Sequence, residues 1–175
     1  MHLYAGDPYW GHTVETPLRF NKLATASQAQ VLIAGGGFTG NLVAHVLCSA
    51  GMDVMVVERG RLGRGSSLAN TGLLQNRSDN MLSEFIADIG AEPALRFYQM
   101  CLQAMDHLTV LSRQLSGPTD YRLRDSIYYA STPAYIVPLQ REYHCLDQHH
   151  FPVEWLSREQ LRDRYRLDKP AALRT

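Results

Sequence analysis

A glycine-rich hexapeptide is the segment of this chain whose residues carry the clearest chemistry. It reads Gly35-Gly36-Gly37-Phe38-Thr39-Gly40 and matches the GxGxxG pattern of dinucleotide-binding loops. In that pattern Gly35 makes the tight turn, Gly37 lets the backbone close on a pyrophosphate, and Gly40 lets a helix pack closely on a strand. A helix that begins here directs free N–H groups and a partial positive charge at the phosphates.

An acidic residue follows the glycines at the distance that a dinucleotide site requires. Glu58 comes close to the expected ~20 residues downstream, where a carboxylate accepts hydrogen bonds from a ribose diol. The same charge repels a 2′-phosphate, which favours adenosine without that group. The alternative is a glycine-rich surface turn with Glu58 as a solvated charge. The agreement of strand, loop, helix and acid favours the dinucleotide site.

The elements around this loop predict one βαβ unit. The apolar run Val31-Leu32-Ile33-Ala34 lacks alternation, as expected for a strand that is buried on both faces of a parallel sheet. A helix is predicted over Phe38 to Ala50, and a second buried strand over Val54 to Val57. Because the strands are so close in sequence, they must form a right-handed parallel crossover.

Further along the chain, the periodicity alternates between helix and strand. Helices are predicted over Met81 to Ile89, Pro93 to Leu115 and Leu139 to Gln148, with Pro138 confining the start of the last one. Strands are predicted over Ser126 to Ser131 and Val153 to Leu156. A capping box then joins Ser157 and Gln160.

Composition excludes several classes of function. Lys plus Arg equals Asp plus Glu at 17 each, so no net charge attracts nucleic acid or an anionic membrane surface. The widely spaced Cys48, Cys101 and Cys145 fit neither a disulfide framework nor a metal site, and no apolar run is long enough to span a membrane. We therefore expect a cytoplasmic protein that has no metal centre.

The sequence after Glu58 carries a resemblance to a known family. It continues as Glu58-Arg59-Gly60-Arg61-Leu62-Gly63-Arg64-Gly65-Ser66-Ser67 and then as Asn70-Thr71-Gly72-Leu73-Leu74, while Ala44 and Gly51 extend the glycine fingerprint. This pattern resembles the D-amino-acid oxidase (DAO) superfamily of FAD-dependent oxidoreductases, which includes glycine, sarcosine and glutamylputrescine oxidases. The resemblance runs from about Tyr9 to the C-terminus and is diffuse beyond Gln75.

The resemblance implies an α/β fold, with a Rossmann-like FAD/NAD(P)-binding βαβ domain and the start of a second, α+β substrate domain. We expect an irregular N-terminal arm over 1–26, the FAD-binding part with its helices over 27–120, and the start of the substrate domain over 121–175. The chain would then be about the N-terminal half of a typical member.

The resemblance also assigns roles to residues near the adenosine and the diphosphate. It implies that Phe38 and Thr39 offer loop backbone to the diphosphate, and that Glu58 and Arg59 flank the adenosine. Asn41 departs from the family pattern, because a small or apolar residue is usual there, and we expect it to loosen helix packing. Asn76-Arg77 stands where an aromatic residue is common and could alter the outer wall of the flavin site.

A second group of residues is implied to contact the rest of the cofactor. Ser66 and Ser67 would bind phosphate or ribityl oxygens; the alternative is that they are turn-forming serines. Thr71, Gly72 and Leu73 would lie beside the isoalloxazine, where a glycine permits close approach to a flat ring.

The function that the resemblance implies is oxidation of the C–N bond of an amino acid or amine, with hydride transfer to the flavin. FAD carries this chemistry, so no acid, base or nucleophile is expected in this region and no catalytic residue is assigned. The alternatives are a non-catalytic or truncated nucleotide-binding module, or an NAD-dependent dehydrogenase; the segment from Ser66 to Leu74 argues against NAD. We expect a small-molecule substrate and self-association through the edge of an incomplete sheet.

Overall fold

The computed structural model describes residues 6–13, 19–117 and 119–175. The chain divides into two compact units, Met1–Leu73 and Leu74–Thr175. In the described part of the chain, no helix has the length and apolar character needed to cross a membrane. The expected FAD-binding part over 27–120 and the expected start of a substrate domain over 121–175 stay predictions. The two compact units show which residues pack together, but they do not show which residues bind a cofactor or a substrate.

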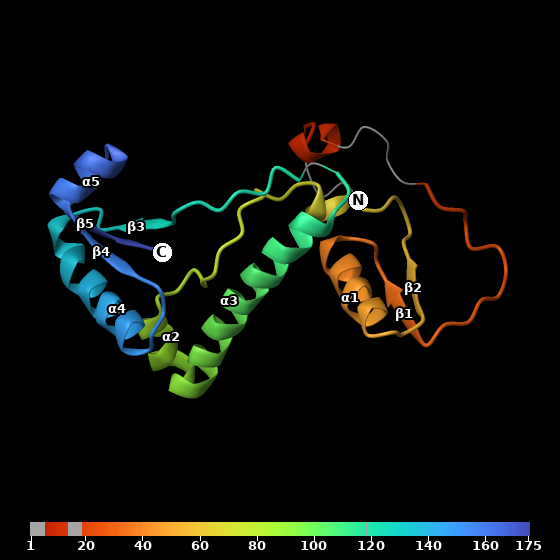
Figure 1. The fold of residues 1–175 in the computed structure, drawn as a ribbon, viewed down its shortest axis with the longest axis horizontal. Coiled ribbons are helices and arrows are strands. Elements are labelled where there is room, and N and C mark those ends of the chain that lie inside the picture. Colours follow the sequence, from red (N-terminus) through yellow and green to blue (C-terminus); the bar gives the residue numbers. More distant parts are fainter. Residues whose placement is uncertain (1–5, 14–18, 118) are drawn as a thin grey trace. The chain divides into compact units, whose positions relative to one another are not determined.

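The first unit contains the predicted βαβ motif. Strand β1 (Val31–Ala34) leads into helix α1 (Phe38–Ser49), and strand β2 (Val54–Val57) follows. The two strands are parallel, and their register runs from Val31 opposite Val54 to Ala34 opposite Val57. Figure 1 shows the helix packed beside the two adjacent strands. The predicted parallel crossover is therefore confirmed.

The expectation that these strands are buried on both faces is wrong for the described residues. Alternate residues of β1 are half-buried and exposed, and the side chain of Leu32 is 65% exposed. The reason is that the first unit has a two-stranded sheet, on which α1 packs next to Ile33. Helix α1 has no fully buried residue either, and Val46 is exposed. Self-association through this sheet stays a prediction.

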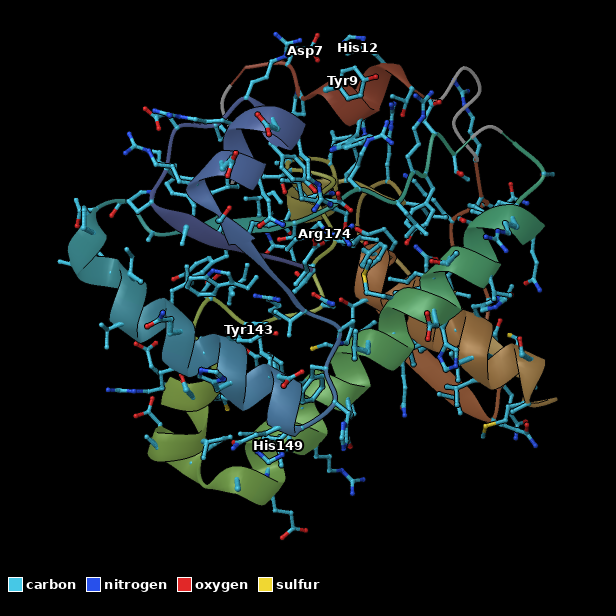
Figure 2. The ribbon with its side chains drawn as sticks, turned by 60° about the vertical axis from the view of Figure 1, so that its left-hand side comes forward. Asp7, Tyr9, His12, Tyr143, His149 and Arg174 are labelled. Atoms are coloured by element: carbon cyan, nitrogen blue, oxygen red, sulfur yellow. The ribbon has the colours of Figure 1, made fainter. Side chains whose placement is uncertain are left out.

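The described part of the N-terminal arm has a short ordered turn. Residues Tyr9–His12 form the 3-10 helix η1, and a second 3-10 turn, η2, spans Gly65–Ser67. The ring of His12 lies 2.9 Å from a carboxylate oxygen of Asp7, at the ends of η1 (Figure 2). Residues 1–5 and 14–18 of the predicted irregular arm lie outside the described residues.

Two helices that pack against each other begin the second unit. Helix α2 (Leu82–Ile89) and helix α3 (Ala91–Gln114) are separated by Gly90, whose φ of +90° allows the sharp change of direction. The 3-10 turn η3 (Pro133–Tyr135) precedes helix α4 (Ile136–Gln148). Helix α4 begins before Pro138, because a proline in the first turn lacks only an N–H that would have no partner in the helix.

The second unit also has a three-stranded antiparallel sheet. Its strands are β3 (Ile127–Tyr129), β4 (Glu154–Ser157) and β5 (Ala171–Arg174), in the order β3-β5-β4. Helix α5 (Arg158–Tyr165) follows β4, and the predicted capping box joins Ser157 and Gln160 at its start. The sequence did not predict β5, although this strand is central and largely buried.

The core lies in the second unit, between the helices and the sheet. Aromatic and aliphatic side chains from α2, α3, α4 and β5 form its main cluster, which includes Leu82, Tyr98, Leu146, Phe151 and Leu173. Tyr143 of α4 packs against this cluster, with its ring centroid 5.9 Å from that of Trp155 (Figure 2). A smaller cluster of Leu156, Leu161 and Ala172 attaches α5 to the sheet.

One carboxylate is buried in this core. Glu142 of α4 accepts hydrogen bonds from the backbone N–H of Leu82 at 2.8 Å and from the N–H and hydroxyl of Ser83 at 2.9 and 2.7 Å. These donors are at the N-terminus of α2, where backbone N–H groups lack partners within the helix. Glu142 therefore connects α4 to α2.

Candidate cofactor-binding site

The glycine loop leaves β1 through a turn that only glycine adopts readily. Gly35 has a φ of +113° and donates its N–H to the carbonyl oxygen of Val57 at 2.8 Å. This bond continues the pairing of the two strands by one residue. Residues with a side chain disfavour this positive φ. Glycine therefore allows the backbone to turn away from the sheet edge into α1.

Gly36 and Gly60 attach the acidic side chain to the glycine loop. The N–H of Gly36 donates to Glu58 Oε2 at 2.9 Å, and the N–H of Gly60 donates to Glu58 Oε1 at 2.7 Å. The hydrogen bond from Gly60 lowers the pKa of Glu58 most, and the bond from Gly36 lowers it further. The positive charge of Arg59 adds to the effect. The carboxylate is therefore ionised at neutral pH and exposed. A carboxylate has about four acceptor positions, so acceptor capacity remains for a ribose diol.

Gly36 is a functional position that the sequence reasoning missed. A Cβ at this position would lie 2.0 Å from Cδ2 of Leu62 and 3.3 Å from Cβ of Glu58. Its carbonyl oxygen accepts a hydrogen bond from the N–H of Gly63 at 2.9 Å. Because Cδ2 is the end of a flexible side chain, the firmer restriction on residue 36 is the 3.3 Å approach to Cβ of Glu58. The run of three glycines was the available signal.

The side chain of Ser67 lies against the N-terminus of α1. A Cβ at Gly37 would lie 3.0 Å from Oγ of Ser67. The N–H of Phe38 donates to that same Oγ at 2.8 Å. Ser67 thus lies at the helix N-terminus, 29 residues away in sequence.

Gly40 permits the close contact between helix and strand. A Cβ here would lie 2.0 Å from the carbonyl oxygen of Gly35 and 3.4 Å from Cγ2 of Ile33. A backbone oxygen cannot move aside as a flexible side chain can. The first turn of α1 therefore approaches β1 only because residue 40 has no side chain.

The N-terminal arm packs against the last part of the predicted site. Trp10 donates its indole N–H to the carbonyl oxygen of Asn70 at 2.8 Å, and the N–H of Gly72 donates to Asn70 Oδ1 at 2.7 Å. Gly72 has a φ of +70°, and a Cβ on it would lie 2.2 Å from Cζ2 of Trp10. Sequence reasoning assigned no role to Asn70 and did not predict this contact of Trp10.

The structure thus brings together part of the predicted site. Gly35, Gly37, Gly40, Glu58 and Ser67 gather around the start of α1. The remaining predicted residues have exposed side chains and do not define a closed pocket: Phe38, Thr39, Arg59, Ser66, Thr71 and Leu73. Asn76 and Arg77 lie instead in the second unit, where they line a small hollow with Tyr98 and Leu102.

Donor and acceptor chemistry at this site fits the adenosine diphosphate part of FAD. An ionised, exposed carboxylate lies beside a glycine loop that leads into the N-terminus of α1. The residues present therefore fit the group for which the loop pattern is typical.

Comparison with known families assigns the chain. Residues 30–175 match the family model of the DAO family of FAD dependent oxidoreductases. The chain belongs to this family. Membership confirms the predicted α/β fold class and the predicted family, whose members are described as FAD-dependent oxidoreductases.

One curated relative and two solved structures are similar to this chain. The gamma-glutamylputrescine oxidoreductase of Escherichia coli K12 is 27% identical over 65% of this chain and 27% of its own length. L-amino acid deaminase from Proteus vulgaris has the same fold, with a TM-score of 0.70, 16% identity, and coverage of 91% of this chain and 36% of that chain. Glycine oxidase from Geobacillus kaustophilus gives a TM-score of 0.62 at 24% identity, covering 83% and 38%.

The chain spans 27% of the curated relative and 36 to 38% of these two structures. This share is smaller than the half that the sequence analysis expected.

Proposed function

We propose that this chain is the FAD-binding part of an oxidoreductase that oxidises the C–N bond of an amino acid or amine. The observation that supports this most strongly is the arrangement of Glu58. Its carboxylate is connected to the glycine loop through Gly36 and to the following segment through Gly60, and it stays ionised and exposed. One anionic group thus faces the place where a ribose diol would lie.

The proposed residue roles follow the parts of FAD in order, from the adenosine through the diphosphate to the flavin ring. Glu58 accepts hydrogen bonds from the ribose of the adenosine, with Arg59 beside it. The backbone N–H groups of Gly37, Phe38 and Thr39 bind the diphosphate at the N-terminus of α1. The absence of a side chain at Gly37 leaves room beside Ser67, while Gly35 allows the turn and Gly40 allows the helix to approach β1.

Ser67 has two roles in this proposal. Its hydroxyl accepts the Phe38 N–H at 2.8 Å, which is the donor that a phosphate oxygen would use. The N–H of Phe38 would serve a phosphate oxygen when FAD is bound, and the Ser67 hydroxyl could then donate to the phosphate, because a hydroxyl is both a donor and an acceptor. Ser66 lies next to it and is exposed, and it is proposed to bind a phosphate or ribityl oxygen.

The segment Thr71, Gly72 and Leu73 is proposed to lie beside the isoalloxazine. Gly72 has no side chain, and the ring of Trp10 lies against the position that its Cβ would take. The hydride acceptor of the reaction is FAD, which supplies the electron chemistry when bound. The chain's own residues bind and orient this acceptor.

An amino acid or amine is the proposed substrate class. The names of the relatives support it, because they describe an oxidoreductase of gamma-glutamylputrescine, a deaminase of L-amino acids and an oxidase of glycine. The balanced charge of 17 basic and 17 acidic residues supports a small-molecule substrate over nucleic acid. We also propose a cytoplasmic location, which the free Cys48, Cys101 and Cys145 support.

A titration with FAD tests the cofactor proposal. Purified protein is titrated with FAD while the visible flavin spectrum and flavin fluorescence are recorded, and parallel titrations use NAD⁺ and NADP⁺. We expect a saturable change with FAD and none with NADP⁺, because Glu58 repels a 2′-phosphate. Saturable binding of NAD⁺ with no response to FAD would favour a nicotinamide-dependent dehydrogenase.

A further inference from the structure

Asn41 makes hydrogen bonds that its position in the family pattern does not lead one to expect. It lies in the first turn of α1, where the resemblance predicts a small or apolar residue. Its side-chain Nδ2 donates to the carbonyl oxygens of Gly36 and Gly37, both at 2.9 Å. We expected Asn41 to loosen helix packing. Its side-chain hydrogen bonds are instead made with the glycine loop.

The two carbonyl oxygens that Asn41 binds are held from more than one side. The oxygen of Gly36 also accepts the N–H of Gly63 at 2.9 Å, and the oxygen of Gly37 also accepts the backbone N–H of Asn41 at 3.1 Å. Each carbonyl thus has two donors. Rotating either peptide would break two hydrogen bonds at once, so the side chain of Asn41 restricts both peptide planes.

Fixing a carbonyl also fixes the N–H of the next residue. In a trans peptide the C=O and the following N–H point in opposite directions. When the oxygens of Gly36 and Gly37 point toward Asn41, the N–H groups of Gly37 and Phe38 must point away from it. The hydrogen bond from Phe38 N–H to Ser67 Oγ shows this direction for one of the two. These N–H groups are the proposed diphosphate donors.

We propose that Asn41 is a positioning residue, which holds the Gly36 and Gly37 carbonyls so that the N–H groups of Gly37 and Phe38 face the diphosphate of FAD. The inference rests on the proposed function and deepens it. A flipped peptide would instead present a partly negative carbonyl oxygen to the phosphates. Asn41 therefore acts on the diphosphate through the loop and without touching it.

Two substitutions of Asn41 separate positioning from helix stability. Asn41→Leu keeps a similar size and removes both donated hydrogen bonds, while leucine is the better helix former. Weaker diphosphate binding in this variant therefore cannot come from a weaker helix. Asn41→Asp keeps the shape but directs a charged acceptor at two carbonyl oxygens. His45→Leu, at an exposed position one turn along α1, is the matched control.

The experiment compares ligands that differ only in phosphate. Wild-type protein and the three variants are titrated with FAD, ADP and adenosine, with circular dichroism as the check of folding. We expect Asn41→Leu to weaken FAD and ADP binding about tenfold, the effect of one hydrogen bond, and Asn41→Asp to weaken it further. Adenosine binding should not change in either variant, and His45→Leu should match the wild type for all three ligands.

Each other outcome overturns the inference. Unchanged FAD and ADP affinity in a folded Asn41→Leu protein overturns it and leaves the proposed function standing. Equal weakening of FAD, ADP and adenosine shows a general structural role and also overturns it. A wild-type protein that binds neither FAD nor ADP contradicts the proposed function and this inference together.

A measurement on the unsubstituted protein covers the case in which the variants do not fold. In ¹⁵N-labelled wild-type protein, the amide resonances of Gly37 and Phe38 and the side-chain amide resonance of Asn41 are followed by NMR. We expect ADP to shift the two backbone resonances while adenosine leaves them in place. If ADP binds without shifting Gly37 and Phe38, their N–H groups are not the donors and the inference is overturned.

Discussion

Trp10 donates its indole N–H to the carbonyl oxygen of Asn70 at 2.8 Å, across 60 residues of sequence. The same ring lies against Gly72, so that a Cβ at that position would meet Cζ2 of Trp10 at 2.2 Å. Leu68, in the same loop, is buried and lies beside Gly11. The N-terminal arm thus stabilises the loop that is proposed to approach the flavin ring.

Replacing Trp10 should release this loop. We expect Trp10→Ala to speed amide hydrogen exchange at residues 68–73 about tenfold or more, because the change removes one hydrogen bond and the packing over Gly72. Hydrogen exchange followed by mass spectrometry measures it in the absence of any ligand. Phe20→Ala is the control, because Phe20 is 70% exposed and should leave exchange in the loop unchanged. Equal exchange in both variants would contradict the role of Trp10.

Replacing Glu58 should weaken FAD binding. We expect Glu58→Ala to cost about 1 to 3 kcal/mol of binding free energy, because a charged acceptor is lost opposite the ribose hydroxyls. Gly37→Val should cost at least as much, since it places a side chain where Ser67 and the diphosphate approach. Titration with FAD measures both. Asp53→Ala, which removes an exposed acid at the other end of β2, should bind FAD as the wild type does.

Replacing the buried carboxylate of Glu142 should destabilise the second unit. Glu142→Ala leaves the N–H groups of Leu82 and Ser83 without their acceptor, and we expect a loss of about 2 to 4 kcal/mol in the free energy of unfolding. The chain has two tryptophans, so in a Trp10→Phe background the fluorescence of Trp155 reports the second unit alone. Urea unfolding measures the change.

The exposed Asp147 on the same helix provides the control for Glu142. Asp147→Ala should leave the urea midpoint within experimental error of the parent protein. A Glu142→Ala protein as stable as Asp147→Ala would show that water replaces the carboxylate without cost. This result would contradict a stabilising role for the hydrogen bonds between Glu142 and the N-terminus of α2.

Stability should fall in alkali through Tyr98. Burial is the main cause that raises the pKa of Tyr98 to about 12, and the charge of Glu142 adds to it. A pKa raised on folding favours the protonated phenol in the native state. The contribution of Tyr98 to stability is therefore complete below pH 10.0, the pKa of the phenol in the unfolded chain. This contribution is lost as the pH rises toward 12. Urea midpoints from about pH 8 to 11 test this, and Tyr98→Phe should show the smaller decline.

Local pattern was sufficient for the βαβ unit and for much of its loop. The unbroken apolar runs of β1 and β2, separated by a short helix, permit little except a parallel crossover. The backbone conformation of Gly35 and the close approach at Gly40 follow from the absence of side chains at these positions. Such features depend on neighbours within a few residues, so the sequence pattern carries them directly.

Other elements depend on partners that are distant in sequence. Strand β5 reads Ala171-Ala172-Leu173-Arg174, which has little β propensity, and it is a strand because β3 and β4 pair with it on both sides. Helix α4 begins before Pro138 because its first turn needs no N–H there. The exposed face of β1 also depends on distant partners. An apolar run predicts that a strand is buried, but another element of the fold must pack on the strand to bury it.

The hydrogen bonds of Trp10, Asn41 and Glu142 were not predictable from residue type alone. The two bonds from Asn41 to the loop depend on the orientation of α1 relative to the Gly36 and Gly37 peptides. Trp10 and Glu142 meet acceptors or donors 60 residues away. Sequence periodicity reports which residues are apolar and which segments are helical, whereas hydrogen-bond direction and distance arise only when segments far apart in the chain have packed together.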